Sequence, residues 1–248
     1  MSKRRERIVF ALSCLGLLAL WQALSMAVDS PVLVPSLLDI VKEAWSVIRS
    51  KAFLLNLGST LLRGAESFAL IAAVSIALAV ASHLYKWVSV ALRPLLLLSK
   101  AVPVMSIILL AFIWFSSAAV PVFSAFLMGF PIMYTQVFSA LESLDPQLEQ
   151  MCLVYGITGK RRLRHFVIPS LEPYLIVGSR QALSVIWKAV IASEVLTVPG
   201  LGVGSRIQLA QVQLETSRVL AWTMAAVLLT ALSDGIFEIL LKRKASWR

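Results

Sequence analysis

Long apolar segments separated by short polar ones dominate the pattern along this chain. Segments with few or no charges cover residues 8–28, 57–82, 94–116, 119–141, 171–196 and 219–241. Each approaches or exceeds the ~20 mostly apolar residues that a helix needs to cross a bilayer. The loops between them are short and leave no room for a second domain. The pattern therefore predicts an all-α, polytopic membrane protein, with residues 1–248 forming one transmembrane domain of six spanning helices.

The longest uncharged run covers residues 101–141. As one helix it would extend roughly 60 Å, about twice the thickness of the hydrocarbon core of a bilayer. It must therefore contribute to two spans, and the small residues 116–119 followed by Pro121 suit a tight outer turn between them. Pro103 and Pro131 lie inside or at the ends of these two spans, and a proline at membrane depth frees backbone carbonyls that neighbours or water must satisfy.

The N-terminus has a basic head, MSKRRER, followed by the uncharged run 8–28. A signal peptide opens in the same way, but its apolar region is usually ~7–15 residues long and ends at a small-residue cleavage site. This run is longer, and Trp21 and Gln22 interrupt any such site. We therefore predict a first transmembrane helix that begins in the cytoplasm.

A separate amphipathic helix is predicted after Pro31 and Pro35, with Ser36 as its cap. Apolar residues recur at helical spacing on one side, opposite charged residues. The apolar side consists of Leu37, Leu38, Val41, Trp45 and Ile48. Such a helix either lies at the membrane surface or docks on the protein outside the lipid, and the sequence leaves both readings open.

Composition and charge agree with a bilayer environment. The chain is 59% hydrophobic and 15% charged, whereas soluble domains average roughly 45–50% and about 25%. The net charge of +10 lies between the apolar spans rather than in a nucleic-acid-binding patch. Lysine and arginine concentrate in segments assigned to the cytoplasm, which follows the positive-inside rule. Both termini are therefore expected in the cytoplasm, and the partner for these charges is anionic lipid, not nucleic acid.

Catalytic chemistry has little support in the sequence. The two histidines and two cysteines have no metal-ligand spacing. The segment VPGLGVG lacks the lysine of a phosphate-binding loop. We therefore expect no enzyme activity, no metal site and no cofactor in this chain. Energy for any transport must come from a partner protein or an ion gradient.

The polar interval 144–169 is the strongest candidate for a partner surface. Asp145 and Pro146 form a helix start signal, Gly156 interrupts the helical pattern, and the basic run KRRLR follows before Pro169. The interval therefore predicts a short helix, a glycine turn and a second basic helix. A simpler interpretation of the basic run is a cytoplasmic anchor, and both roles are compatible.

This interval resembles the EAA loop of ABC importer permeases, in which E-A-A-x-x-x-G is followed by a proline thirteen residues after the glycine. Gln150, Met151 and Cys152 stand in the place of Glu-Ala-Ala, and Gly156 and Pro169 match the glycine and proline. The substitutions at the first three positions bear on which ATPase fits, and we expect a dedicated partner.

The wider sequence is similar to the nitrate, sulfonate, taurine and bicarbonate branch of these permeases. The matching segments are LVPSLLDIV, AVPVMSIILLAFIWF, FPIMYTQVFSALESLDPQL, IWKAVIASEVL and PGLGVG. The resemblance implies the type I importer permease fold and a location in the bacterial inner membrane. It also implies a second permease subunit, with a homodimer expected, and a separate substrate-binding protein.

In that family the EAA loop forms a coupling helix, between the fourth and fifth spans, that docks on a cytoplasmic ATPase dimer. The residues placed there by the resemblance are Gln150, Met151, Cys152, Tyr155, Gly156, Lys160, Arg161 and Pro169. ATP and Mg²⁺ would then bind in the partner ATPase. The resemblance also places the solute path along the centre of the dimer, lined by the third to fifth spans.

Candidate path residues are Met105, Trp114, Phe115, Lys188 and Glu194. Apolar side chains there also suit simple packing, while Lys188 is able to attract an anion or, with help from other helices, to pair with Glu194. Arg63 and Glu66 lie three residues apart and are able to pair with each other. Two further functions stay open: a secondary transporter driven by an ion gradient, and a membrane scaffold.

Overall fold

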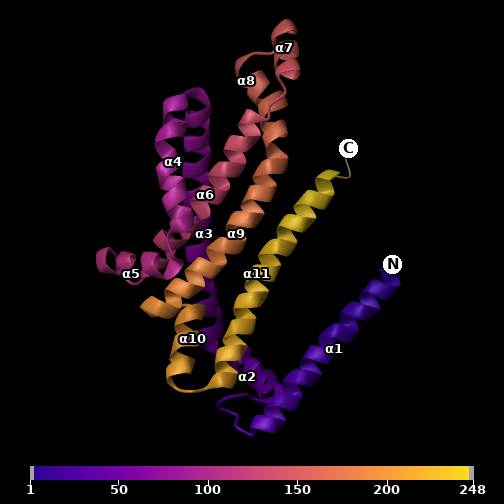
Figure 1. Ribbon diagram of the computed structural model, residues 1–248, viewed down its shortest axis with the longest axis vertical. Coiled ribbons are helices and arrows are strands. Elements are labelled where there is room, and N and C mark those ends of the chain that lie inside the picture. The colour runs from indigo at the N-terminus through magenta and orange to yellow at the C-terminus, as the bar shows by residue number, and fades with distance from the viewer. Residues whose placement is uncertain (1–2, 246–248) are drawn as a thin grey trace.

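The computed structural model describes residues 3–245 and is helical throughout, without a strand in that range. Figure 1 shows the arrangement of the helices. In order they are α1 (Lys3–Val28), α2 (Leu37–Arg49), α3 (Lys51–Leu84), α4 (Lys86–Ala101), α5 (Val104–Trp114), α6 (Val120–Glu142), α7 (Pro146–Val154), α8 (Gly159–Arg162), the π-helical turn η1 (Leu163–Val167), α9 (Ile168–Thr197), α10 (Val203–Val212) and α11 (Thr216–Ala245).

The core lies where α3, α6 and α9 pack against one another. Ile71, Phe130 and Ile186 come from these three helices and are almost completely buried. Gly64 of α3 lies so close to Trp187 of α9 that a Cβ atom there would overlap the indole ring. The absence of a side chain at this position therefore sets how closely α3 and α9 approach.

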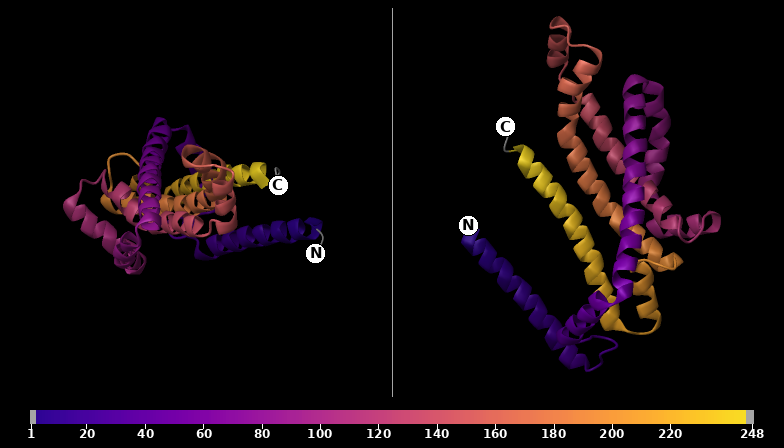
Figure 2. Two further views of the ribbon diagram at one scale, coloured as in Figure 1. Left: turned by 90° about the horizontal axis from the view of Figure 1, so that it is seen from above. Right: turned by 180° about the vertical axis from the view of Figure 1, so that it is seen from behind.

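The helices outside this core differ in how closely they pack against the rest of the molecule. The helix α11 contacts α9, α10 and α2. By contrast, α1 contacts α2 and lies apart from α3, α6 and α9 in Figure 1 and in the right-hand view of Figure 2. It is attached near α2, where the Trp21 indole donates to the Pro35 carbonyl at 3.1 Å and Gln22 accepts from the Leu37 amide at 3.2 Å. Most of its side chains are exposed, as expected of a helix surrounded by lipid.

Five helical segments are long and apolar enough to cross a membrane, and a sixth crossing is possible if α4 and α5 together form a broken span. This range agrees with six predicted spans, but the third differs from expectation. Residues 94–116 do not form one continuous helix, because α4 and α5 meet at 103°. The chain leaves helical geometry at Val102, which has ψ 130°, immediately before Pro103. Proline disfavours the helical conformation of the residue before it, which explains the break.

Helix starts and stops elsewhere follow the expected signals. Ser36 caps α2 by accepting from the Asp39 amide at 3.2 Å. In α2, Ile40 and Val47 are buried on the docked side, whereas the predicted apolar residues Leu38, Val41, Trp45 and Ile48 are exposed. The helix therefore packs against its neighbours with one side and leaves a mostly apolar side free, as a helix at the membrane surface requires.

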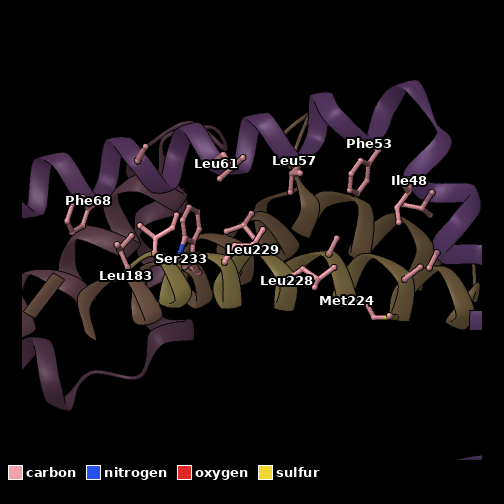
Figure 3. A pocket seen from close by; sticks show the side chains of 18 residues that line it. Ile48, Phe53, Leu57, Leu61, Phe68, Leu183, Met224, Leu228, Leu229 and Ser233 are labelled. Atoms are coloured by element: carbon pink, nitrogen blue, oxygen red, sulfur yellow. The ribbon is translucent and has the colours of Figure 1, made fainter. Parts of the chain in front are cut away.

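An apolar groove of about 630 Å³ separates α3 from α11. In Figure 3, Leu57 and Leu61 of α3 face Leu228 and Leu229 of α11 across this groove. Its lining is apolar or aromatic apart from Ser233. Such a wall offers few groups that could orient a polar solute, so this groove is not a candidate for the solute path.

Candidate functional site

The predicted coupling loop forms a helix–turn–helix hairpin at one end of the molecule, opposite α2 and α10 (Figure 1). Asp145 caps α7 by accepting from the Gln147 amide at 2.8 Å. The helix ends at Val154, and Gly156 follows two residues later with a φ of +66°, in the left-handed region that glycine adopts without strain. The Gly156 amide donates to the Leu153 carbonyl and the Ile157 amide to the Cys152 carbonyl. This pair of bonds is a Schellman motif, which stops α7 sharply.

The hairpin presents apolar side chains to solvent at its tip. Tyr155 is 74% exposed, Val154 84% and Met151 48%. Gln150 and Gly156 are exposed beside them. Cys152 differs, because its side chain is buried. Of the expected coupling residues in α7, Cys152 is therefore placed to support the surface rather than to contact a partner.

The basic half of the hairpin combines free and paired charges. Lys160 and Arg161 are exposed in α8. Arg162 forms an ion pair with Glu149 that ties α8 back to α7. Pro169 lies in the first turn of α9, directly after the π-helical turn η1. The hairpin is thus a braced unit that leads, through η1, into the central helix α9.

At the opposite end of the molecule, the Glu194 carboxylate joins three segments. It is fully buried and accepts from the Gly204 amide at 2.9 Å. Arg63 reaches it at 2.7 Å, and the Thr60 hydroxyl lies within hydrogen-bond distance of both of its oxygens. Because Arg63 and Thr60 belong to α3, this carboxylate fastens α3 and the start of α10 to α9. We call Glu194, Arg63, Thr60 and Asn56 the outer clamp.

Asn56 completes the outer clamp from α3. Its side-chain oxygen accepts from the Gly202 amide at 2.9 Å and from Arg206 at 3.1 Å. Sequence analysis missed Asn56, Thr60 and Arg206. The available signal was the recurrence of polar residues at 56, 60, 63 and 67 along one side of an otherwise apolar helix.

Two charge pairs that the sequence allows do not form in the structure. Arg63 pairs with Glu194 and not with Glu66, which is exposed. Lys188 does not pair with Glu194 either, because the carboxylate faces the clamp while Lys188 is exposed on another side of α9. A spacing of six residues places side chains on different sides of a helix, so local geometry favours this outcome. Glu194 is consequently buried away from any open path in this structure.

The three other candidate path residues gather around α5. Met105 and Trp114 lie in α5 and are 56% and 67% exposed. Phe115 follows at its end, with its ring centroid 4.8 Å from that of Phe123 in α6. Since α5 turns away from α4, these residues do not share one straight span with residues 94–101. They form an exposed apolar surface that a single chain leaves uncovered.

Comparison with known proteins identifies the family. The description "Binding-protein-dependent transport system inner membrane component" matches residues 69–246, which include the hairpin and the helices α6, α9, α10 and α11. The chain belongs to this family. It is a multi-pass permease subunit of an ABC importer, and this membership selects against the gradient-driven carrier and the scaffold.

Individual relatives agree over nearly the whole chain. The aliphatic sulfonates transport permease protein of Bacillus subtilis is 23% identical over 94% of this chain and 84% of its own length. The protein with the same description in Escherichia coli is 25% identical over 94% of this chain and 89% of its own length. The formylaminopyrimidine transport permease protein of Halalkalibacterium halodurans is 27% identical, with 85% of each chain covered. Membership implies an ATPase and a substrate-binding protein as partners of this permease.

Proposed function

We propose that the hairpin of α7 and α8 is the surface on which a cytoplasmic ABC ATPase docks, and that ATP and Mg²⁺ bind in that partner. The observation that supports this proposal is the exposure of Met151, Val154 and Tyr155 at the tip of a hairpin braced by the Arg162–Glu149 ion pair. Exposed apolar groups of this kind are typical of protein interfaces. Gln150, Lys160 and Arg161 are exposed polar residues of the same hairpin, and interfaces commonly combine an apolar centre with polar groups at the rim.

The assembly that follows contains two copies of this chain, an ATPase dimer on the side of the hairpin, and a substrate-binding protein on the side of α2 and α10. Both termini then lie in the cytoplasm and the chain lies in the bacterial inner membrane. The direct connection from η1 into α9 supports this proposal mechanically, because movement of the hairpin acts on the helix that carries Lys188 and Glu194. Two docked hairpins would shift the two α9 helices together when the ATPase dimer closes.

Co-purification of the ATPase encoded beside the permease tests this surface. Val154→Asp places a charge at the exposed tip without changing the backbone, and Gly156→Arg projects a long cation from a position where a Cβ would meet open space. Because an arginine at φ +66° is also strained, Val154→Asp is the cleaner variant. Both variants are expected to lose the ATPase, by at least tenfold in recovered protein.

Val212→Asp is the matched control. Val212 is 70% exposed at the end of α10, at the other end of the molecule, and receives the same charge. This variant is expected to recover the ATPase at the wild-type level. Recovery of the ATPase with Val154→Asp as well would show that the hairpin tip is not the docking surface.

A further inference from the structure

The amphipathic helix α2 is held against one end of the spanning bundle. The helices α1 and α3, which are both long and apolar enough to cross a membrane, precede and follow it in the chain, so α2 stays close to a membrane surface. On its packed side, Ile40 and Val47 are buried, and Glu43 accepts from Arg218 of α11 at 2.6 Å. Contacts with the rest of the protein therefore fix which side of α2 stays exposed.

The exposed part of α2 divides into three strips that run along the helix. Successive residues of an α-helix are rotated by about 100°, so the order of side chains around the axis follows from their numbers. Next to the packed side lies an apolar strip, then a basic edge, and then a polar strip. The apolar strip consists of Leu38, Val41, Trp45 and Ile48, the basic edge of Lys42 and Arg49, and the polar strip of Ser46 and Asp39.

The apolar strip is exposed along its whole length. Leu38 is 61% exposed and Val41 64%. Ile48, at the other end of the strip, also lines the apolar groove between α3 and α11 (Figure 3). The strip is therefore continuous with the apolar surface of the spanning helices. This arrangement is typical of a helix that lies in the membrane interface with its apolar side among acyl chains.

The basic edge carries two cations without an acid partner. Lys42 and Arg49 are exposed, and within residues 3–245 neither of them forms an ion pair. The acids nearest to Lys42 in the sequence are engaged elsewhere, because Asp39 accepts from the Ser36 hydroxyl at 2.6 Å and Glu43 pairs with α11. The two cations lie two helical turns apart, roughly 10 Å along the axis. The edge is therefore a row of positive charge that awaits an anionic partner.

Trp45 indicates the depth at which this edge lies. Its ring belongs to the apolar strip, and the Arg49 guanidinium is 4.5 Å from the ring centroid. Tryptophan side chains collect where the hydrocarbon of a membrane meets the headgroups. With the apolar strip in hydrocarbon, Lys42 and Arg49 extend to the level of the lipid phosphates. A guanidinium there donates two parallel hydrogen bonds to one phosphate.

We infer that α2 binds the membrane through its apolar strip and that the basic edge holds the phosphates of anionic phospholipids. Anionic lipids are favoured because a zwitterionic headgroup neutralises its own phosphate. The leaflet concerned lies on the side of α2 and α10, which is the outer side in the proposed orientation. The inference goes beyond the proposed ATPase docking and requires no partner protein.

Spin labelling of the full-length permease in lipid nanodiscs tests what covers the apolar strip. Nitroxides are attached to Val41→Cys in the strip and to Ser46→Cys, the matched control on the polar strip of the same helix. Both variants also carry Cys14→Ser, because Cys14 is exposed, and Cys14→Ser alone provides the blank. Collisions with oxygen, relative to those with a water-soluble nickel chelate, are expected to be about fivefold more frequent for Val41→Cys.

Two results of this experiment would overturn the inference. Few collisions with either reagent at Val41→Cys would show that protein covers the strip, either a second copy of the chain or the substrate-binding protein. Equal collision ratios at the two positions would place both sides of α2 in the same medium.

Local lipid selectivity tests the basic edge. The nanodiscs contain phosphatidylglycerol, which is anionic, and phosphatidylcholine, which is zwitterionic. A bimane on Val41→Cys is quenched on contact when one of these lipids carries a nitroxide on its acyl chain, so exchanging the labelled lipid gives their relative affinity at α2. The preference for phosphatidylglycerol is expected to fall by about fivefold with Lys42→Gln and again with Arg49→Gln, the contribution of one basic side chain near an anionic surface.

Two control variants complete this test. Lys42→Arg keeps the charge and is expected to keep the preference. Lys86→Gln removes an exposed cation beyond the far end of α3 and is expected to leave the preference at α2 unchanged. An unchanged preference in both Lys42→Gln and Arg49→Gln would overturn the inference, and so would an equal fall in Lys86→Gln. These measurements use no ATPase, so their outcome is independent of the docking proposal.

Discussion

At the scale of single residues, Glu194 links three segments at the outer end of the bundle. Its carboxylate bonds to Arg63, Thr60 and the Gly204 amide while fully buried. A buried ion pair contributes little net stability compared with apolar packing, but removal of one member leaves the other charge without its partner. Glu194 therefore acts mainly by holding α3, α9 and α10 in one arrangement. Its removal is expected to destabilise the folded protein.

Glu194→Gln is expected to lower the free energy of unfolding by about 3 kcal/mol, because Arg63, only 12% exposed, loses its charged partner. Thermal unfolding of the purified permease in nanodiscs measures this as a drop of several degrees in the unfolding midpoint. Glu66→Gln is the matched control, since Glu66 is an exposed acid on the same helix as Arg63. Equal midpoints for the two variants would contradict the importance of the clamp.

At the level of helices, close packing between α3 and α9 depends on a glycine. A Cβ atom at Gly64 would overlap the Trp187 ring, which is 5% exposed and held in the core. The same helix contains Gly58, around which a Cβ would meet no atom within 4 Å. The two glycines therefore separate the effect of packing from the effect of backbone flexibility.

Gly64→Ala is expected to destabilise the permease by about 1–3 kcal/mol through overpacking. Gly58→Ala is expected to be neutral or to stabilise it by up to ~1 kcal/mol, since alanine favours a helix more than glycine does. Unfolding midpoints of the two variants, measured side by side, check this prediction. Similar midpoints would mean that α3 and α9 adjust to the extra methyl group.

The break between α4 and α5 is a feature that the apolar pattern alone does not predict. The run 101–141 has no charge that would mark a boundary, so hydropathy alone places one continuous span over 94–116. Pro103 marks the break in the sequence, but a proline inside a membrane helix produces anything from a slight kink to a full turn. The observed angle of 103° depends on the packing of α5 against α6 and α9.

For the whole molecule, the proposed orientation places the α7–α8 hairpin in the cytoplasm and α10 outside. Thiol labelling of intact cells with a membrane-impermeant maleimide checks it. Gln213→Cys, exposed after α10, is expected to react in intact cells. Thr158→Cys, exposed in the hairpin, is expected to react only after permeabilisation. The reverse pattern would invert the topology and move the proposed ATPase surface to the wrong side of the membrane.

The sequence by itself determined the features that depend on neighbouring residues and on solvation. Apolar run length predicted the membrane-spanning class, which family membership confirms. Asp145, Pro146 and Gly156 predicted the helix, turn and helix of the hairpin, because caps and left-handed turns are local properties. Ser36 predicted the start of α2 in the same way. Motif resemblance correctly placed the chain among importer permeases.

Only the tertiary structure decided which distant residues meet. Arg63 and Glu194 are far apart in the chain, and their pairing follows from the closeness of α3 and α9. The same packing buries Glu194 while leaving Lys188 exposed, although the two residues share one helix. Helical periodicity states which side chains share a face, but not which face a neighbouring helix covers. That choice depends on the whole bundle, and it separates the buried carboxylate of Glu194 from the exposed Lys188.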